Sequence, residues 1–202
     1  MTQSAPRETR ALPAVHRSLG LNALLGSVRG DRSYSILDLG PALEANVGFW
    51  SQFSCRLHIH NFYRNYRTWK AAATPGEASA EAALTALLPF RDEMVFDLIL
   101  AWDLFDYFDL RELEPLVQRL SRWCRPGTRL LALISSLPNI PVSPTLFRIR
   151  NRDQIIYEIP TQATRPCPRH EPRDILRLMA RFTVRSSFLL RHGVREYVFE
   201  FK

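Results

Sequence analysis

The stretch SYSILDLGPALEANVGFW, residues 33–50, decides the fold of this chain. Residues 36–39 form a short apolar run with one acid, which indicates a buried strand. Gly40 and Pro41 interrupt the run, and the apolar side chains of residues 42–53 recur with helical spacing. The first amide groups of a helix carry partial positive charge, so a tight strand-to-helix turn of this kind predicts a nucleotide-type ligand.

The same stretch resembles the first motif of the class I S-adenosylmethionine (SAM) dependent methyltransferases, an apolar strand that continues as Asp-x-Gly-x-Gly-x-Gly. Asp38 and Gly40 match this motif, whereas Ala42 and Glu44 stand at the second and third glycines. The resemblance implies that SAM binds at a turn formed by Asp38, Gly40, Pro41 and Ala42. Side chains at the second and third glycines add bulk where the backbone should approach the cofactor closely.

The composition is that of an ordinary globular protein with one domain. The chain has 202 residues, of which 46% are hydrophobic and 23% charged. We expect residues 1–12, which are polar and contain proline, to be disordered and residues 13–202 to form one domain. Three widely spaced cysteines indicate neither a disulfide framework nor a zinc ribbon. With no signal core and no apolar run of about 18 residues, the sequence predicts a cytoplasmic protein without membrane contact.

Positive charge is concentrated towards the two ends of the chain. The net charge is +7, and the excess lies in residues 1–33 and 145–202, with a slightly acidic stretch between them. Nearly all of it is arginine, since Lys70 and Lys202 are the only lysines. No motif of a known nucleic-acid-binding module accompanies this charge, so nucleic acid is a possible but not a favoured partner. An RNA-binding module in the arginine-rich C-terminal third is the weakest of the alternatives.

The remaining sequence alternates between predicted strands and helices. Residues 64–88 are alanine-rich and helical, so a third strand of the sheet is not readable there. We predict an α/β fold with a mostly parallel, seven-stranded methyltransferase-type sheet, helices on both faces and a C-terminal antiparallel strand pair. Strands are expected at 55–59, 96–102 and 128–135, helices at 13–28, 109–125 and 172–181, a hairpin at 143–160, and the final strand pair at 182–201.

The resemblance continues at the ends of the strands, where open α/β sheets bind their ligands. In the family an acid at the end of the second strand binds the ribose of SAM, and this sequence has His60 and Asn61 there. A Leu-Pro-Phe turn precedes the fourth strand, as in the family, which implies that Pro89 and Phe90 also contact SAM. The acid that meets the adenine in many members has no counterpart in residues 84–87.

Asp103 and Tyr107 are the candidates for the acceptor side of the site. The family commonly places a polar group that faces the substrate after the fourth strand, which implies this role for Asp103. Tyr107 belongs to an aromatic group that either lines an acceptor pocket or packs in the core. Asp103, Asp106 and Asp109 are spaced by three residues. A helix cap at Asp109, a solvated Asp106 and an Asp103 that holds the loop explain them better than a metal site, so we expect no metal.

Two functions are consistent with these residues. The first is a SAM-dependent methyltransferase with an atypical cofactor turn, whose acceptor, a small molecule or a macromolecule, the sequence does not specify. The second is a methyltransferase fold that has lost catalysis and serves as a binding or regulatory protein. Asp38, Gly40 and the loop that carries Asp103 favour the first function. Ala42, Glu44 and the missing ribose and adenine acids favour the second.

Overall fold

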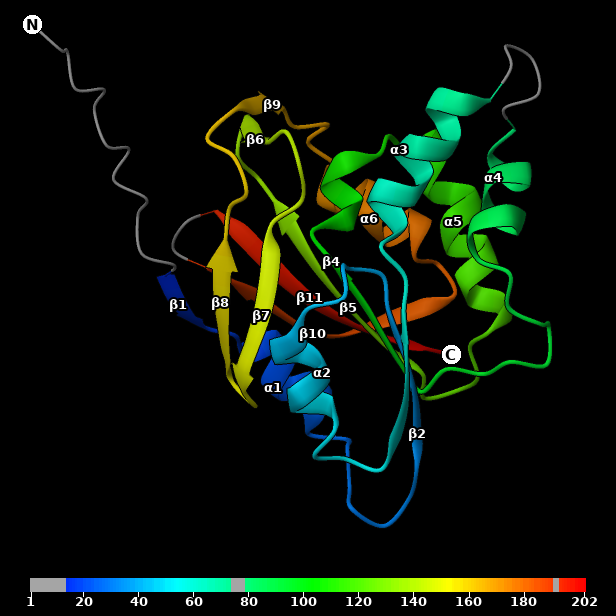
Figure 1. Ribbon diagram of the computed structural model, residues 1–202, viewed down its shortest axis with the longest axis vertical. Coiled ribbons are helices and arrows are strands. Elements are labelled where there is room, and N and C mark those ends of the chain that lie inside the picture. Colours follow the sequence, from blue (N-terminus) through cyan, green and yellow to red (C-terminus); the bar gives the residue numbers. More distant parts are fainter. Residues whose placement is uncertain (1–13, 74–78, 191–192) are drawn as a thin grey trace, which may run out of the picture.

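The computed structural model describes residues 14–73, 79–190 and 193–202 and centres on one large sheet (Figure 1). Residues 1–12, which were predicted to be disordered, lie outside these ranges. The sheet has the strand order β10-β11-β5-β4-β2-β3. Its strands are β2 (Tyr34–Asp38), β3 (Cys55–Ile59), β4 (Leu98–Trp102), β5 (Arg129–Ser135), β10 (Phe182–Leu189) and β11 (Val194–Phe201).

The pairing of these strands confirms the α/β class. β2 pairs in parallel with β3 and β4, and β4 pairs in parallel with β5. β11 runs antiparallel to both β5 and β10, as predicted for the C-terminal strands. The described residues form six strands in this sheet instead of seven, because the alanine-rich segment after β3 forms the helices α3 (Phe62–Ala72) and α4 (Ala80–Leu87). β3 is therefore an outer strand of the sheet in this part of the chain.

Helices cover both faces of the sheet, as predicted. One apolar core joins the sheet to α3, α4, α5 and α6, and the other joins it to α1 and α2. β4 is buried along its whole length because it lies between these two layers. None of the helices in the described ranges is both long and apolar enough to cross a membrane. The remaining helices are α1 (Leu19–Leu25), α2 (Glu44–Trp50), η1 (Leu104–Tyr107, a 3-10 helix), α5 (Leu110–Arg122) and α6 (Pro172–Leu178).

The start of α5 confirms a sequence-based prediction. The Asp109 carboxylate accepts a hydrogen bond from the Glu112 amide at 2.9 Å, and the Glu112 carboxylate accepts one from the Asp109 amide at 3.3 Å. This reciprocal pair is a capping box, which satisfies two backbone donors at the helix start.

Two smaller sheets lie outside the large one (Figure 1). The hairpin predicted for residues 143–160 is present as β7 and β8, and β1 adds to β8 in antiparallel orientation. β6 and β9 form a two-stranded ribbon at the end of the molecule towards which β4 and β5 point. The bounds are β1 (Ala14–Arg17), β6 (Asn139–Pro141), β7 (Leu146–Asn151), β8 (Gln154–Glu158) and β9 (Thr164–Pro166).

The helix predicted for residues 13–28 is correct only in its second half. Its first residues form β1, and helix α1 begins after Ser18, whose hydroxyl accepts a hydrogen bond from the Leu21 amide at 3.0 Å. β1 pairs with a strand that lies far away in the sequence, and such a partner overrides the local helical spacing.

Candidate functional site

Asp38 ends β2 and lies beneath the turn that follows it. Its side chain is only 1% exposed. The Oδ1 atom accepts hydrogen bonds from the Gly40 amide at 2.9 Å and from the Trp102 indole Nε1 at 2.7 Å. Burial raises the pKa of Asp38 to about 6, and these hydrogen bonds oppose the rise. Both donors are groups of the protein, so Asp38 links the turn after β2 to Trp102 at the end of β4.

Gly40 makes room for the indole of Trp102. A Cβ atom at this position would lie 3.0 Å from Cδ1 of Trp102 and 3.0 Å from Oδ1 of Asp38. Both distances are shorter than ordinary van der Waals contacts. The matching glycine of the methyltransferase motif is expected to admit the cofactor, whereas here a tryptophan of the chain makes the close approach.

Trp102 is held in an unusual backbone conformation at the end of β4. Its φ is 51°, in the left-handed region that bulky residues rarely adopt. The ring stacks on Phe147 of β7, with ring centroids 5.2 Å apart and planes 7° apart. A backbone conformation of this kind costs about 1–3 kcal/mol and persists only where the surrounding packing requires it. The indole thus fills the space between the turn after β2 and the hairpin β7–β8.

Asn46 of α2 fixes the hairpin in this position. Its Nδ2 atom donates to the Phe147 carbonyl at 3.0 Å, and its Oδ1 atom accepts from the Ile149 amide at 2.8 Å. Asn46 is buried, so both hydrogen bonds are shielded from water. No sequence-based expectation concerned this residue, because its role depends on a hairpin about 100 residues further along the chain.

The space that remains at the ends of β2 and β4 is small. The cavity has a volume of about 30 Å³, which is room for one or two water molecules. Binding sites for small molecules usually measure about 300–1,000 Å³. A nucleoside-sized ligand such as SAM therefore does not fit here. The residues predicted to bind ligand that line this cavity are Gly40, Pro41, Asn61 and Asp103.

Asp103 and Tyr107 both hold the loop between β6 and β7. The Asp103 carboxylate accepts a hydrogen bond from the Thr145 amide at 3.0 Å, and the Tyr107 hydroxyl donates to the Ser143 carbonyl at 2.9 Å. Burial raises the pKa of Asp103 to about 7 and also raises the pKa of Tyr107. An acid with this pKa can exchange a proton at neutral pH, but in this structure it faces a backbone amide. The expectation that Asp106 is solvated was wrong, because Asp106 is buried and its carboxylate accepts a hydrogen bond from the Ser135 amide at 3.0 Å.

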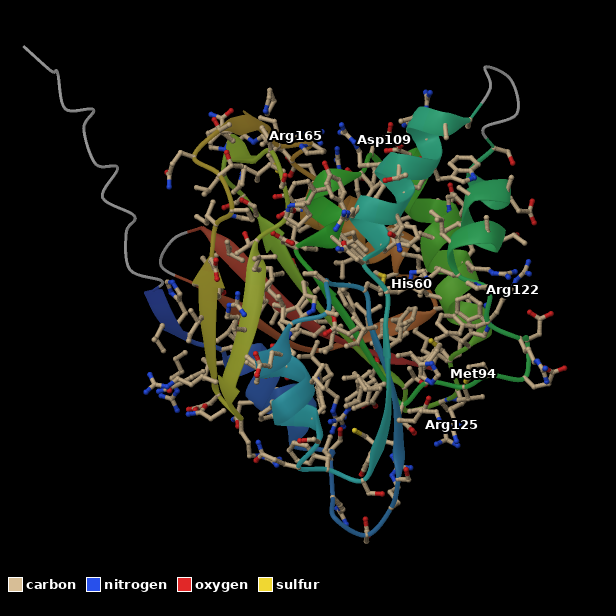
Figure 2. All side chains as sticks on the ribbon, viewed as in Figure 1. His60, Met94, Asp109, Arg122, Arg125 and Arg165 are labelled. Carbon is tan, nitrogen blue, oxygen red and sulfur yellow. The ribbon has the colours of Figure 1, made fainter. Side chains whose placement is uncertain are left out.

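The other predicted ligand-binding residues lie elsewhere. His60 is at the base of α3 (Figure 2), and its ring packs against Phe90 at 6.1 Å. Phe90 in turn packs against Trp123, and Pro89 is exposed. Burial lowers the pKa of His60. Neither His60 nor Phe90 lines the small cavity, and Ala42, which is exposed, does not line it either.

A second, larger hollow opens beside the small cavity. This cleft has a volume of about 840 Å³ and lies between α3 and the loops that join β6, β7 and β9. It shares Pro41, Asn61, Tyr63 and Pro144 with the small cavity. Arg165 of β9 stands at the upper end of the molecule in the view of Figure 2.

Three arginines line this cleft, and sequence reasoning missed them. Arg64 and Arg67 are three residues apart on α3, a spacing that places both on one side of a helix. The three-residue spacing of Arg64 and Arg67 was the only signal in the sequence that these two arginines lie together. Arg165 joins them because β9 pairs with β6, which no local pattern indicates.

Comparison with known proteins identifies the fold. No protein-family model matches the sequence, and no curated protein matches it. Among solved structures, the PH0226 protein of Pyrococcus horikoshii matches with a TM-score of 0.54 and 14% identity, over 89% of this chain and 86% of that chain. A SAM-dependent methyltransferase of Clostridium acetobutylicum matches with a TM-score of 0.51 and 10% identity, over 90% and 91%. The chain therefore has the predicted class I methyltransferase fold.

Proposed function

We propose that this methyltransferase fold serves as a binding or regulatory protein and does not transfer methyl groups from SAM. The observation that carries the proposal is the small volume of the hollow at the end of β2. Its volume of about 30 Å³ is roughly a tenth of the smallest usual ligand site. The Trp102 indole occupies the neighbouring space and uses the Asp38 oxygen that ends the strand.

The parts that close the hollow are fastened at several points. Asn46 binds the backbone of β7 twice, and Asp103 and Tyr107 each bind the loop that precedes it. Opening the hollow requires these hydrogen bonds to break together with the stack of Trp102 on Phe147. The two Asn46 hydrogen bonds are buried, and each one that is lost without replacement costs about 1–3 kcal/mol, so this arrangement opposes widening of the hollow.

The charges around the site also disfavour SAM. The reactive sulfur of SAM is a cationic sulfonium, and the adjoining cleft presents three arginines. At the end of β3 this chain has His60 and Asn61 where the family has an acid for the ribose, and of these two only Asn61 lines the cavity and the cleft. The loss of one hydrogen bond to a charged group weakens binding by about 1.5–3 kcal/mol, which is roughly tenfold to a hundredfold.

A SAM-dependent methyltransferase with an unidentified acceptor is the second candidate. It is favoured by the fold and by the position of the cleft, which starts at Pro41 and Asn61 and is large enough for a nucleoside. In this case Asp103 and Tyr107 would face the acceptor only after releasing Thr145 and Ser143.

Titration with SAM and its demethylated product separates the two candidates. We expect no calorimetric signal and no change in melting temperature at 1 mM ligand. The C. acetobutylicum methyltransferase serves as the positive control. A ligand at 100 times its Kd stabilises a protein by about 2.7 kcal/mol, so a clear rise in melting temperature with either compound would contradict the proposed binding role.

A further inference from the structure

The 840 Å³ cleft carries positive charge without compensation. Arg64 and Arg67 come from α3, and Arg165 faces them from β9. Among the described residues, no aspartate or glutamate lines the cleft. The three guanidinium groups are therefore gathered where no carboxylate of the lining neutralises them.

These arginines differ from the arginines that acids neutralise elsewhere in the described residues. Ion pairs occupy arginines elsewhere, such as Arg125 with Asp97 at 2.6 Å and Arg129 with Glu200 at 2.9 Å. Within residues 14–73, 79–190 and 193–202, Arg64, Arg67 and Arg165 form no ion pair.

The next cation along α3 is paired with an acid. Lys70 binds the Glu112 carboxylate at 2.7 Å, and both line a neighbouring hollow of about 420 Å³, which Arg67 and Arg165 also line. Because Glu112 adds a negative charge there, an anion binds more favourably in the cleft, whose described lining contains no acid.

The remaining lining of the cleft suits the uncharged part of a small anionic ligand. Tyr63 provides an aromatic ring, and the Arg67 guanidinium lies 6.0 Å from the centre of that ring. Other lining residues are apolar or carry hydroxyl and amide groups, namely Pro41, Asn61, Thr68, Val142, Ser143, Pro144, Leu146 and Pro160. The volume lies within the usual range for small-molecule sites. Several guanidinium groups around one space recognise phosphate oxygens by paired hydrogen bonds.

We propose that this cleft binds a small phosphorylated molecule with at least two negative charges, of the nucleoside diphosphate class. This inference rests on the proposed binding role and deepens it. In a SAM-dependent enzyme, SAM would occupy the part of the cleft next to Pro41 and Asn61, where the phosphorylated molecule is placed here. Phosphate oxygens bind Arg64, Arg67 and Arg165, and the planar or apolar part lies against Tyr63.

Calorimetric titration with pyrophosphate, ADP and adenosine tests the proposal. We expect pyrophosphate and ADP to bind, and adenosine to bind at least tenfold more weakly than ADP. Arg67→Gln and Arg165→Gln should each weaken ADP binding about tenfold or more, since each removes hydrogen bonds to a charged group. Arg173→Gln is the matched control, because Arg173 is highly exposed on α6 and away from the cleft. Circular dichroism and melting curves check that the variants fold.

Three results would overturn the proposal. The first is no binding of pyrophosphate or ADP at millimolar concentration, and the second is equal ADP binding by the wild type and the Arg67→Gln/Arg165→Gln variant. The third is a single-stranded RNA of 12 nucleotides that binds more tightly than ADP and loses affinity in that variant, which would assign the cleft to nucleic acid. If SAM and ADP are both inert, only this inference fails; if SAM binds, the proposed function fails.

Discussion

The hydrogen bond from Trp102 to Asp38 can be tested by its dependence on pH. Trp102→Phe keeps a ring against Phe147 but removes the indole donor that lies 2.7 Å from Oδ1 of Asp38. A hydrogen bond to a buried charged group contributes about 1.5–3 kcal/mol. We therefore expect Trp102→Phe to lower the free energy of unfolding by about this amount at pH 8, where Asp38 is ionised.

The sign of the pH effect follows from the raised pKa of Asp38. Its pKa is about 6 in the folded protein, whereas an ordinary aspartate has a pKa of 3.8. Folding therefore favours the protonated form of Asp38. Ionisation of Asp38 therefore costs stability, and this cost grows as the pH rises from about 4 through 6 to a limit of roughly 3 kcal/mol. Without the indole donor the pKa rises further, so Trp102→Phe should lose less stability at pH 5 than at pH 8.

Urea denaturation at pH 5 and pH 8 measures both values. The matched control is Trp123→Phe, because the buried Trp123 indole donates to the neutral Arg91 carbonyl at 3.1 Å. Its loss should be about 0.5–1.5 kcal/mol at both pH values. An equal loss at pH 5 and pH 8 for Trp102→Phe would refute the reasoning, since the indole would then not be bound to an ionising carboxylate.

Three further predictions concern the surroundings of the small hollow and the start of α5. Gly40→Ala should destabilise the protein by about 1–3 kcal/mol, because the new methyl group would lie 3.0 Å from the Trp102 ring; urea denaturation checks this, and an unchanged midpoint would contradict it. Tyr107→Phe removes the hydrogen bond to Ser143 and should cost about 0.5–1.5 kcal/mol. It should also speed hydrogen exchange in residues 142–145, and unchanged exchange there would show that Tyr107 does not hold the loop. Asp109→Ala removes the capping box of α5 and should cost about 1 kcal/mol; thermal melting measures it, with Asp109→Asn as the conservative control that retains most of the stability.

The parts of the fold that local patterns encode were predictable from the sequence. β3 was expected at residues 55–59 and has these bounds, because the alternation of apolar and polar residues along it is a local feature. β1 was missed because it is a short strand whose partner, β8, lies about 140 residues away. The missing seventh strand follows from the helical residues after β3, which the sequence did indicate.

The position of the candidate site was predictable from the sequence, but the side chain that fills it was not. The expected residues Gly40, Asn61 and Asp103 do lie around one cavity, because parallel strands end at the same edge of a sheet. That Trp102 would adopt a positive φ and fill this edge depends on packing against β7, which lies outside any local pattern. Whether SAM binds the expected residues stays a prediction for the titration.

The outer position of β3 has a consequence for self-association. A strand at the border of a sheet exposes amide and carbonyl groups that a second copy could pair with, which is a common route to aggregation. Arg56 lies within β3 and its side chain is exposed. Two copies joined in antiparallel orientation about the centre of β3 would bring their Arg56 guanidinium groups to the same surface, where like charges repel. Charge thus protects a border of the sheet that no further strand covers in the described part of the chain.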